Sequence, residues 1–210
     1  MTAKQGLAFQ KAFGTRALKI PAVAFLFSLG DILKYPPSSD FDMILTKPAI
    51  LREIKHKRVK VTPFDKRVIG PASIDLSLGD KLRVFTNPTI IKIVETSDGL
   101  HHTKLISINK GYALQPGELV LGITKETLKL PDDICGFIHS RSRFARLGLM
   151  THITAPFLQP GINNKQTLEI YNASKNVLVL KPGVKICAVV LCRTDGSAHY
   201  QGKYKRQAQP

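Results

Sequence analysis

The sequence predicts a mainly β domain, a distorted β-barrel or jelly roll, with one short helix at the start of its main body. Short segments with alternating or continuous apolar residues follow one another from residue 72, each bounded by Gly, Pro, Asn or Asp. Three similar turns, at 114–117, 158–161 and 180–183, end in Pro-Gly. Proline presets the first central φ of a type II turn, and glycine supplies the positive φ of the second.

The main body is predicted to span 43–210, after an N-terminal extension of unknown role over 1–42. The extension has no acidic residue in its first 30 positions, and its end, 35–42, has the Pro and Ser content of a linker. Its apolar run at 20–29 is about half as long as a membrane-spanning helix. We therefore expect one domain that makes no membrane contact.

One helix is expected near 46–55, because Ile50 and Ile54 fall on one face and Pro48 stands in the first turn, where proline is tolerated. Thr46 is the candidate N-cap. The β segments expected after this helix are 72–85, 89–95, 104–108, 118–124, 135–140, 149–155, 167–172, 177–183 and 185–192.

The formal net charge of +16 indicates an anionic partner, which composition leaves open among nucleic acid, an anionic membrane surface and a phosphorylated metabolite. With no Trp, five Tyr and no helix-turn-helix or finger spacing, recognition of nucleic acid is not expected. A barrel that binds RNA through the basic run 55–67 is the remaining nucleic-acid hypothesis. Three cysteines without a CxxC spacing argue against disulfides and zinc, and favour a reducing cytoplasm.

An arginine cluster is the first candidate for anion binding. Arg141, Arg143 and Arg146 lie in "HSRSRFARLGLMTH", where a turn of helix capped by Ser142 is one reading. A nucleic-acid backbone, a polyphosphate or water would each suit such a cluster. The segment 134–172 holds a single acidic residue, Glu169.

In a strand, Thr167, Glu169 and Tyr171 share one face, while Leu168 and Ile170 share the other. From spacing alone, Glu169 is most simply a solvent-facing side chain. The sequence pattern therefore does not assign it a role.

Several motifs together resemble a known family. "RSRFARLGLMTHITA", a following "PG" and then "TLEIYN" resemble the signature of dCTP deaminases, the nucleotide-converting branch of the trimeric dUTPase superfamily. "MILTKPAILREI", "KRVKVTPF", "IGPASIDLSLGDKLRVF", "LQPGELVLGIT" and "YQGKYKRQ" resemble the family in the same order. The resemblance runs from about Met43 to Gln207.

This resemblance implies a dUTPase-like barrel that assembles as a homotrimer, with three active sites at subunit interfaces. It implies deamination of dCTP to dUTP with release of ammonia, supplying dUTP for thymidylate synthesis. Arg141, Ser142 and Arg146 of one subunit would then face Glu169 of its neighbour. Arg143 stands where the family more often has a small polar residue, so at most a supporting role is expected of it.

The chemistry expected of this site requires water to attack C4 of cytosine. Zinc deaminases activate that water under HxE and PCxxC motifs, and the sequence contains neither. A carboxylate that acts first as base and then as acid can move the proton instead, and Glu169 is the candidate. Ser142 would bind the water or the departing ammonia, and Arg146 would orient Glu169 and stabilise the charged intermediate.

By the same resemblance, the backbone at Ile153 and Ala155 would bind the edge of the pyrimidine. A closing tail over 196–210 would cover the nucleotide, which makes Tyr200, Lys203 and Gln207 candidate triphosphate contacts. Mg²⁺ is expected to arrive on the triphosphate, held mainly by phosphate oxygens and water, without dedicated protein ligands.

The resemblance also implies feedback inhibition by dTTP through the region of His152.

Gln159 is a departure from the superfamily, which usually has an aspartate there; in dUTPases that aspartate activates the attacking water. An amide cannot act as a base, so the sequence favours an enzyme that stops at dUTP. A dUTP diphosphatase or a bifunctional enzyme that forms dUMP is the alternative, and a non-catalytic nucleotide- or RNA-binding barrel is a second. Gln159 itself is still expected to contact the substrate.

Overall fold

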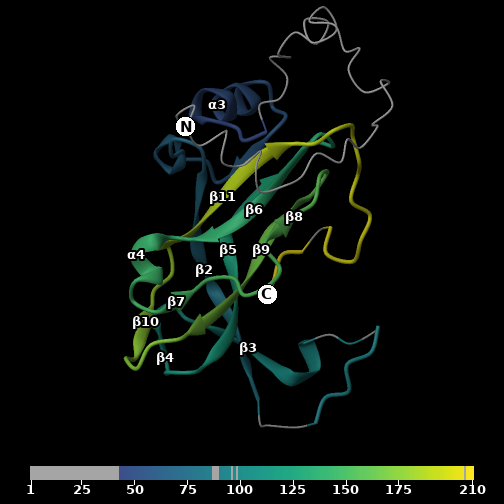
Figure 1. Ribbon diagram of the computed structural model, residues 1–210. Coiled ribbons are helices and arrows are strands. Elements are labelled where there is room, and N and C mark those ends of the chain that lie inside the picture. Colours follow the sequence, from purple (N-terminus) through teal and green to yellow (C-terminus); the bar gives the residue numbers. More distant parts are fainter. Residues whose placement is uncertain (1–42, 87–89, 96, 98, 206) are drawn as a thin grey trace, which may run out of the picture. The chain divides into compact units, whose positions relative to one another are not determined.

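The computed structural model describes residues 43–210 apart from 87–89, 96, 98 and 206 (Figure 1). The predicted extension 1–42 lies outside the described residues. The main body is mainly β, as predicted. Its strands are β1 (Lys60–Thr62), β2 (Ile74–Phe85), β3 (Thr103–Ser107), β4 (Tyr112–Leu114), β5 (Leu119–Lys129), β6 (Ile134–Ser140), β7 (Leu149–Met150), β8 (Phe157–Leu158), β9 (Asn163–Asn172), β10 (Leu178–Leu180) and β11 (Lys185–Arg193). The helices are α3 (Lys47–Lys55) and α4 (Ser142–Ala145), with 3-10 turns at Lys66–Val68 and Leu100–His102.

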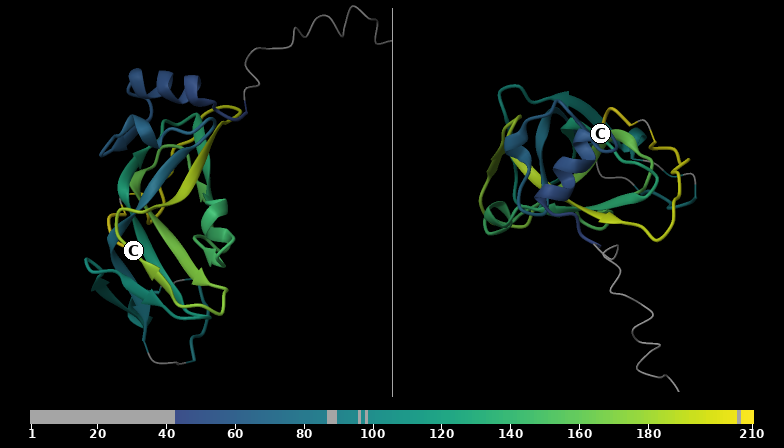
Figure 2. Two further views of the ribbon diagram at one scale, coloured as in Figure 1. Left: turned by 90° about the vertical axis from the view of Figure 1, so that its left-hand side faces the viewer. Right: turned by 90° about the horizontal axis from the view of Figure 1, so that it is seen from above.

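One antiparallel sheet carries most of the strands, in the order β7-β9-β5-β2-β11-β6-β8. β1 pairs with β5 and β3 pairs with β2 beside this path, while β10 and β4 form a separate two-stranded ribbon. The sheet curls strongly, as the two views in Figure 2 show. β5 joins β9 to β2 near the centre of the path, so β9 is held along much of its length.

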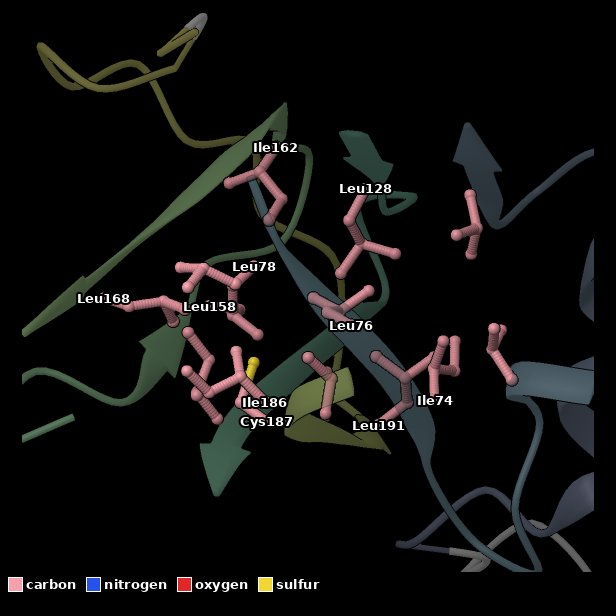
Figure 3. Close-up of a cluster of buried hydrophobic side chains, with 14 of the residues drawn as sticks. Ile74, Leu76, Leu78, Leu128, Leu158, Ile162, Leu168, Ile186, Cys187 and Leu191 are labelled. Atoms are coloured by element: carbon pink, nitrogen blue, oxygen red, sulfur yellow. The ribbon is translucent and has the colours of Figure 1, made fainter. Parts of the chain in front are cut away.

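The core lies inside this curl. Leu76 and Leu78 of β2, Leu168 of β9 and Leu191 of β11 are all buried, and Figure 3 shows them pointing into one cluster with their neighbours. Strand alternation sends Leu168 and Ile170 into this cluster. The same alternation turns Thr167 and Glu169 to the opposite face of β9.

The predicted helix is confirmed as α3. Thr46 occupies the N-cap with extended backbone angles, although its hydroxyl makes no capping hydrogen bond. Pro48 lies in the first turn, where a backbone N–H would have no partner within the helix. Ile50 is fully buried against the core.

The three Pro-Gly turns also form as predicted. Gly117, Gly161 and Gly183 have φ values of +75°, +77° and +82°. At Gly161 a side chain would also collide with the tail, because an added Cβ would lie 2.5 Å from Nδ1 of His199. This turn therefore requires glycine for conformation and for space.

Two β predictions were wrong. The described part of 89–95 forms no strand, and Ile90 and Ile93 are 93% and 84% exposed. Apolar side chains there had suggested a strand, but no neighbouring strand pairs with them in the described chain. Of 149–155, only Leu149–Met150 is a strand, because the amides of Ile153 and Thr154 donate to Glu169 instead of to a neighbouring strand.

Candidate active site

Glu169 lies in the middle of β9 and is held at one of its two carboxylate oxygens. Oε2 accepts hydrogen bonds from the backbone N–H of Ile153 at 2.9 Å and of Thr154 at 3.1 Å. Within the described chain, Oε1 accepts none. The irregular segment after β7 thus fixes the position of the carboxylate and leaves one oxygen available for a ligand or for water.

A cavity of about 710 Å³ opens beside this carboxylate. Its wall contains parts of β9, the turn after β8 and the C-terminal tail. Six residues predicted from the sequence for catalysis or substrate binding line it together: Ala155, Gln159, Glu169, Tyr200, Lys203 and Gln207. Their roles stay predictions, but the fold brings residues that are far apart in the sequence to one space.

The charge of the cavity wall favours an anion. Among the described residues of the wall, Arg83, Lys165 and Lys203 contribute basic side chains, against one acidic side chain, that of Glu169. Nε of Arg83 donates to the backbone oxygen of Pro210 at 2.7 Å, which places this guanidinium at the end of the tail. Arg83 and Lys165 are not among the residues predicted for the site. Arg83 falls in a predicted strand beside the buried Leu82, whereas Lys165 has polar neighbours and no local signal.

The tail is fastened to the same chain at several points. Nδ1 of His199 and Oδ1 of Asp132 lie 2.6 Å apart, next to the turn at Gly161. Further along, Nδ2 of Asn164 donates to the backbone oxygen of Tyr204 at 2.6 Å. The amide of Lys165 donates to the backbone oxygen of Gln207 at 3.0 Å.

The arginine cluster is not part of this cavity within one chain. Arg141 forms an ion pair with Asp75, with Nη1 and Oδ2 3.1 Å apart. Ser142 and Arg146 are exposed on or beside α4, at the left of Figure 1. No hydrogen bond or ion pair joins Glu169 to an arginine in the described chain. The structure therefore does not bring the predicted catalytic Ser142 and Arg146 to Glu169 of the same subunit.

The proposed cap of α4 was wrong in one detail. Arg141, not Ser142, occupies the N-cap position, and Ser142 is the first helical residue. Gly148 closes the turn with φ of +83°, and its amide donates to the carbonyl of Ala145 at 2.9 Å. Four helical residues are enough to present Ser142 and Arg146 outward.

His152 lies between Glu169 and β6. Its Nδ1 is buried without a hydrogen-bond partner in the described chain, and its ring meets that of His139 edge to face at 6.3 Å. Burial is the main cause that lowers the pKa of His152 below its usual 6.5, with a further contribution from His139, while Glu169 opposes the shift. Burial and His139 therefore both favour the neutral imidazole.

Among the described residues, no group of three or more His, Cys, Asp or Glu side chains gathers in a way that could hold a metal ion. None of the described helices has the length and apolar content needed to cross a bilayer.

Comparison with known proteins agrees with this fold. The dCTP deaminase-like family model matches residues 44–194. The "dCTP deaminase, dUMP-forming" of Mycolicibacterium smegmatis is 38% identical over 177 residues, covering 80% of this chain and 94% of that protein. The protein of the same name from Rhodococcus opacus is 38% identical over 162 residues, covering 75% and 85%.

Among solved structures, 2′-deoxycytidine 5′-triphosphate deaminase from Agrobacterium tumefaciens matches with a TM-score of 0.58 and 22% identity. The match covers 72% of this chain and 48% of that chain, so it spans about half of the Agrobacterium protein and supports the fold. The family model and the matched relatives, together with the mainly β fold, lead to one assignment: this chain belongs to the dCTP deaminase-like family.

Proposed function

We propose that this protein deaminates dCTP and carries the reaction on to dUMP. The observation that carries the proposal is the carboxylate of Glu169, fixed at one oxygen and unpaired at the other, in a basic cavity. The names of the matched relatives support dUMP as the product. They favour the bifunctional alternative over the first expectation from the sequence, in which the reaction stops at dUTP.

Glu169 supplies the proton transfers in this proposal. Oε1 takes a proton from water as the water oxygen bonds to C4, and the carboxyl group passes this proton to N3 of the ring. The carboxylate then takes the proton of the new C4 hydroxyl and gives it to the amino group, so the C4–N bond breaks, ammonia leaves and the C4 carbonyl forms. The overall change is dCTP plus water to deoxyuridine triphosphate plus ammonia.

The remaining catalytic groups come from a second subunit in a homotrimer. Ser142 and Arg146 are exposed, and the described chain has no hydrogen bond or ion pair between either of them and Glu169, which suits side chains that complete a neighbour's site. Arg146 then stabilises the charged intermediate, and Ser142 binds the water or the departing ammonia. Arg141 would need to exchange or share its Asp75 partner in order to bind the triphosphate.

The tail and the basic wall bind the phosphates. Lys203 and Gln207 line the cavity, and Arg83 and Lys165 add charge next to them. Mg²⁺ would enter this site bound to the triphosphate, because phosphate oxygens and water can supply its ligands. The ion would neutralise phosphate charge and support cleavage between the α- and β-phosphates.

A second candidate stops at dUTP, and Gln159 favours it. This side chain lines the cavity, and its amide cannot take a proton from water. In the proposed dUMP-forming reaction, another group must activate the water that attacks phosphorus.

A product assay tests both candidates. Purified protein is incubated with dCTP and Mg²⁺, and ammonia, dUTP, dUMP and pyrophosphate are measured over time. The proposal expects ammonia and pyrophosphate in equal amounts, with dUMP as the final nucleotide. Ammonia with dUTP alone would establish the second candidate, and no ammonia at all would overturn the deaminase assignment.

A further inference from the structure

Thr167 lines the cavity two residues before Glu169 on the same face of β9. Its Oγ1 is buried and has no hydrogen-bond partner in the described chain. A buried hydroxyl without a partner destabilises a fold, and such groups in native proteins call for a reason. A ligand group in the cavity would provide the missing partner.

The position of Thr167 along β9 indicates which part of a nucleotide it would meet. Glu169 marks the place of the base, where deamination occurs. The first residues of β9 hold the tail, through the bonds from Asn164 to Tyr204 and from Lys165 to Gln207, and this end therefore marks the phosphates. Two strand residues span about 7 Å, so Thr167 lies between these two ends, level with the sugar.

Deoxyribose offers one hydroxyl that is free to form a hydrogen bond, at its 3′ position. We propose that Thr167 is a substrate-binding residue whose hydroxyl bonds the 3′-hydroxyl of the bound deoxyribonucleotide. The proposal rests on the proposed function, because that function fixes the base at Glu169. Thr167 then contributes to specificity for nucleotides that carry a 3′-hydroxyl. It takes no part in the proton transfers.

The hydroxyl of the neighbouring Thr124, unlike that of Thr167, has hydrogen-bond partners in the described chain. Thr124, on β5, is fully buried, but its hydroxyl donates to the backbone oxygen of Glu126 at 2.8 Å and accepts from the amide of Gln166 at 2.9 Å. The hydroxyl of Thr124 is thus satisfied within the fold. This makes Thr124 a matched control on the adjacent strand.

The test combines Thr167→Val with 2′,3′-dideoxycytidine triphosphate, which lacks the 3′-hydroxyl. We expect the wild type to have a kcat/KM about tenfold lower for the dideoxy compound than for dCTP, as the loss of one good hydrogen bond implies. Thr167→Val should lower kcat/KM for dCTP by a similar factor and leave the dideoxy value unchanged. An equal loss with both compounds, or no loss with dCTP, would overturn the inference.

Thermal unfolding separates a binding role from a structural one. Because Thr167→Val removes an unsatisfied polar group, the Tm without ligand should stay the same or rise. Thr124→Val should lower Tm and keep the discrimination between the two nucleotides. A fall in Tm for Thr167→Val, with unchanged discrimination, would show a structural hydroxyl and refute the proposal.

Binding measurements distinguish failure of this inference from failure of the proposed function. Calorimetry with both nucleotides is performed in a Glu169→Gln background, alone and combined with Thr167→Val, so that deamination through Glu169 is removed. With Thr167 intact, dCTP should bind about tenfold more tightly than the dideoxy compound, and Thr167→Val should remove this difference. This result is expected even if the wild type releases no ammonia. If the wild type releases ammonia but both variants bind both nucleotides with equal affinity, the proposed role of Thr167 is wrong and the proposed function still stands.

Discussion

The two oxygens of Glu169 have different surroundings, and this difference explains how a lone carboxylate can serve in proton transfer. Two backbone amides hold Oε2, so the side chain does not swing away when its charge changes. Oε1 has no partner in the described chain and adjoins the cavity. A group that must be both base and acid needs this combination of fixed position and free oxygen.

Glu169→Gln should reduce ammonia release from dCTP by a factor of about 10² to 10⁴, because the amide keeps the shape but cannot exchange the proton. Nucleotide affinity should change little. Single-turnover kinetics and calorimetry measure the two effects separately. Glu95→Gln, at an exposed position, is the control and should keep full activity. Undiminished ammonia release by Glu169→Gln would remove Glu169 from the mechanism.

The C-terminal tail shows how an element can depend on a few anchors. Its first anchor joins His199 to Asp132 beside the turn at Gly161, and later ones join Tyr204 and Gln207 to β9. These anchors keep Tyr200 and Lys203 in the cavity wall, although the described residues of the tail form neither helix nor strand.

His199→Ala should loosen the tail and raise KM for dCTP about threefold to tenfold, with a smaller effect on kcat, since the lost bond holds binding residues only. Limited proteolysis should cut the tail faster in the variant. His56→Ala, at the exposed end of α3, serves as the matched control. If proteolysis becomes faster while KM stays unchanged, the tail does not contribute to substrate binding.

Helix α3 is joined to the sheet by a charged cluster. Nε of Arg58 and Nη2 of Arg193 each donate to the buried carboxylate of Glu53 at 2.7 Å. Burial opposes the charge of Glu53, but the hydrogen bonds and charges of Arg58 and Arg193 outweigh it and lower its pKa below 4.5. The carboxylate is therefore ionised in the folded protein over the neutral range.

Glu53→Gln should destabilise the fold by about 2 kcal/mol at pH 7, because two part-buried guanidiniums lose a charged hydrogen-bond partner. A lowered pKa contributes stability above the unfolded value, and this contribution disappears as pH falls through the folded value. The difference in Tm between wild type and variant should therefore shrink below pH 4.5. A difference that is constant with pH would contradict the ion-pair account. Asp65→Asn, which removes an exposed ion pair, should change Tm little at any pH.

At the scale of the whole molecule, the sequence predicts β2, β3, β6 and β11 nearly in full and parts of β5 and β9, but not the short strands β1, β4 and β8. β2, β5, β9 and β11 follow their apolar patterns because those residues form the core. The segments 89–95 and 149–155 have similar apolar patterns. The described part of the first has no strand to pair with, and two amides of the second bond to Glu169 instead of to a strand. Such tertiary contacts are not encoded in local periodicity.

The site was predictable only where motifs carried it. Glu169 and the tail residues follow from the resemblance, whereas the basic wall at Arg83 and Lys165 depends on which strands the fold places together. In the proposed function, the arginines on and around α4 act across a contact between subunits, and a single chain does not contain that contact.

Regulation by dTTP also belongs to this scale, and it stays a prediction. Nδ1 of His152 has no hydrogen-bond partner in the described chain, and His152 directly precedes the amides that hold Glu169, so a shift of this segment would move the carboxylate. We expect added dTTP to slow deamination at subsaturating dCTP. Rates that do not change with dTTP would argue against such coupling.

The most direct test of the shared site uses two variants that are each inactive alone, Glu169→Gln and Arg146→Ala. They are co-expressed with different tags, and mixed assemblies are isolated on both tags in succession. In a cyclic trimer of either mixed composition, one of the three interfaces combines an intact arginine with an intact glutamate, so about a third of wild-type ammonia release should return. Mixed assemblies with no more activity than the separate variants would contradict a site built from two subunits.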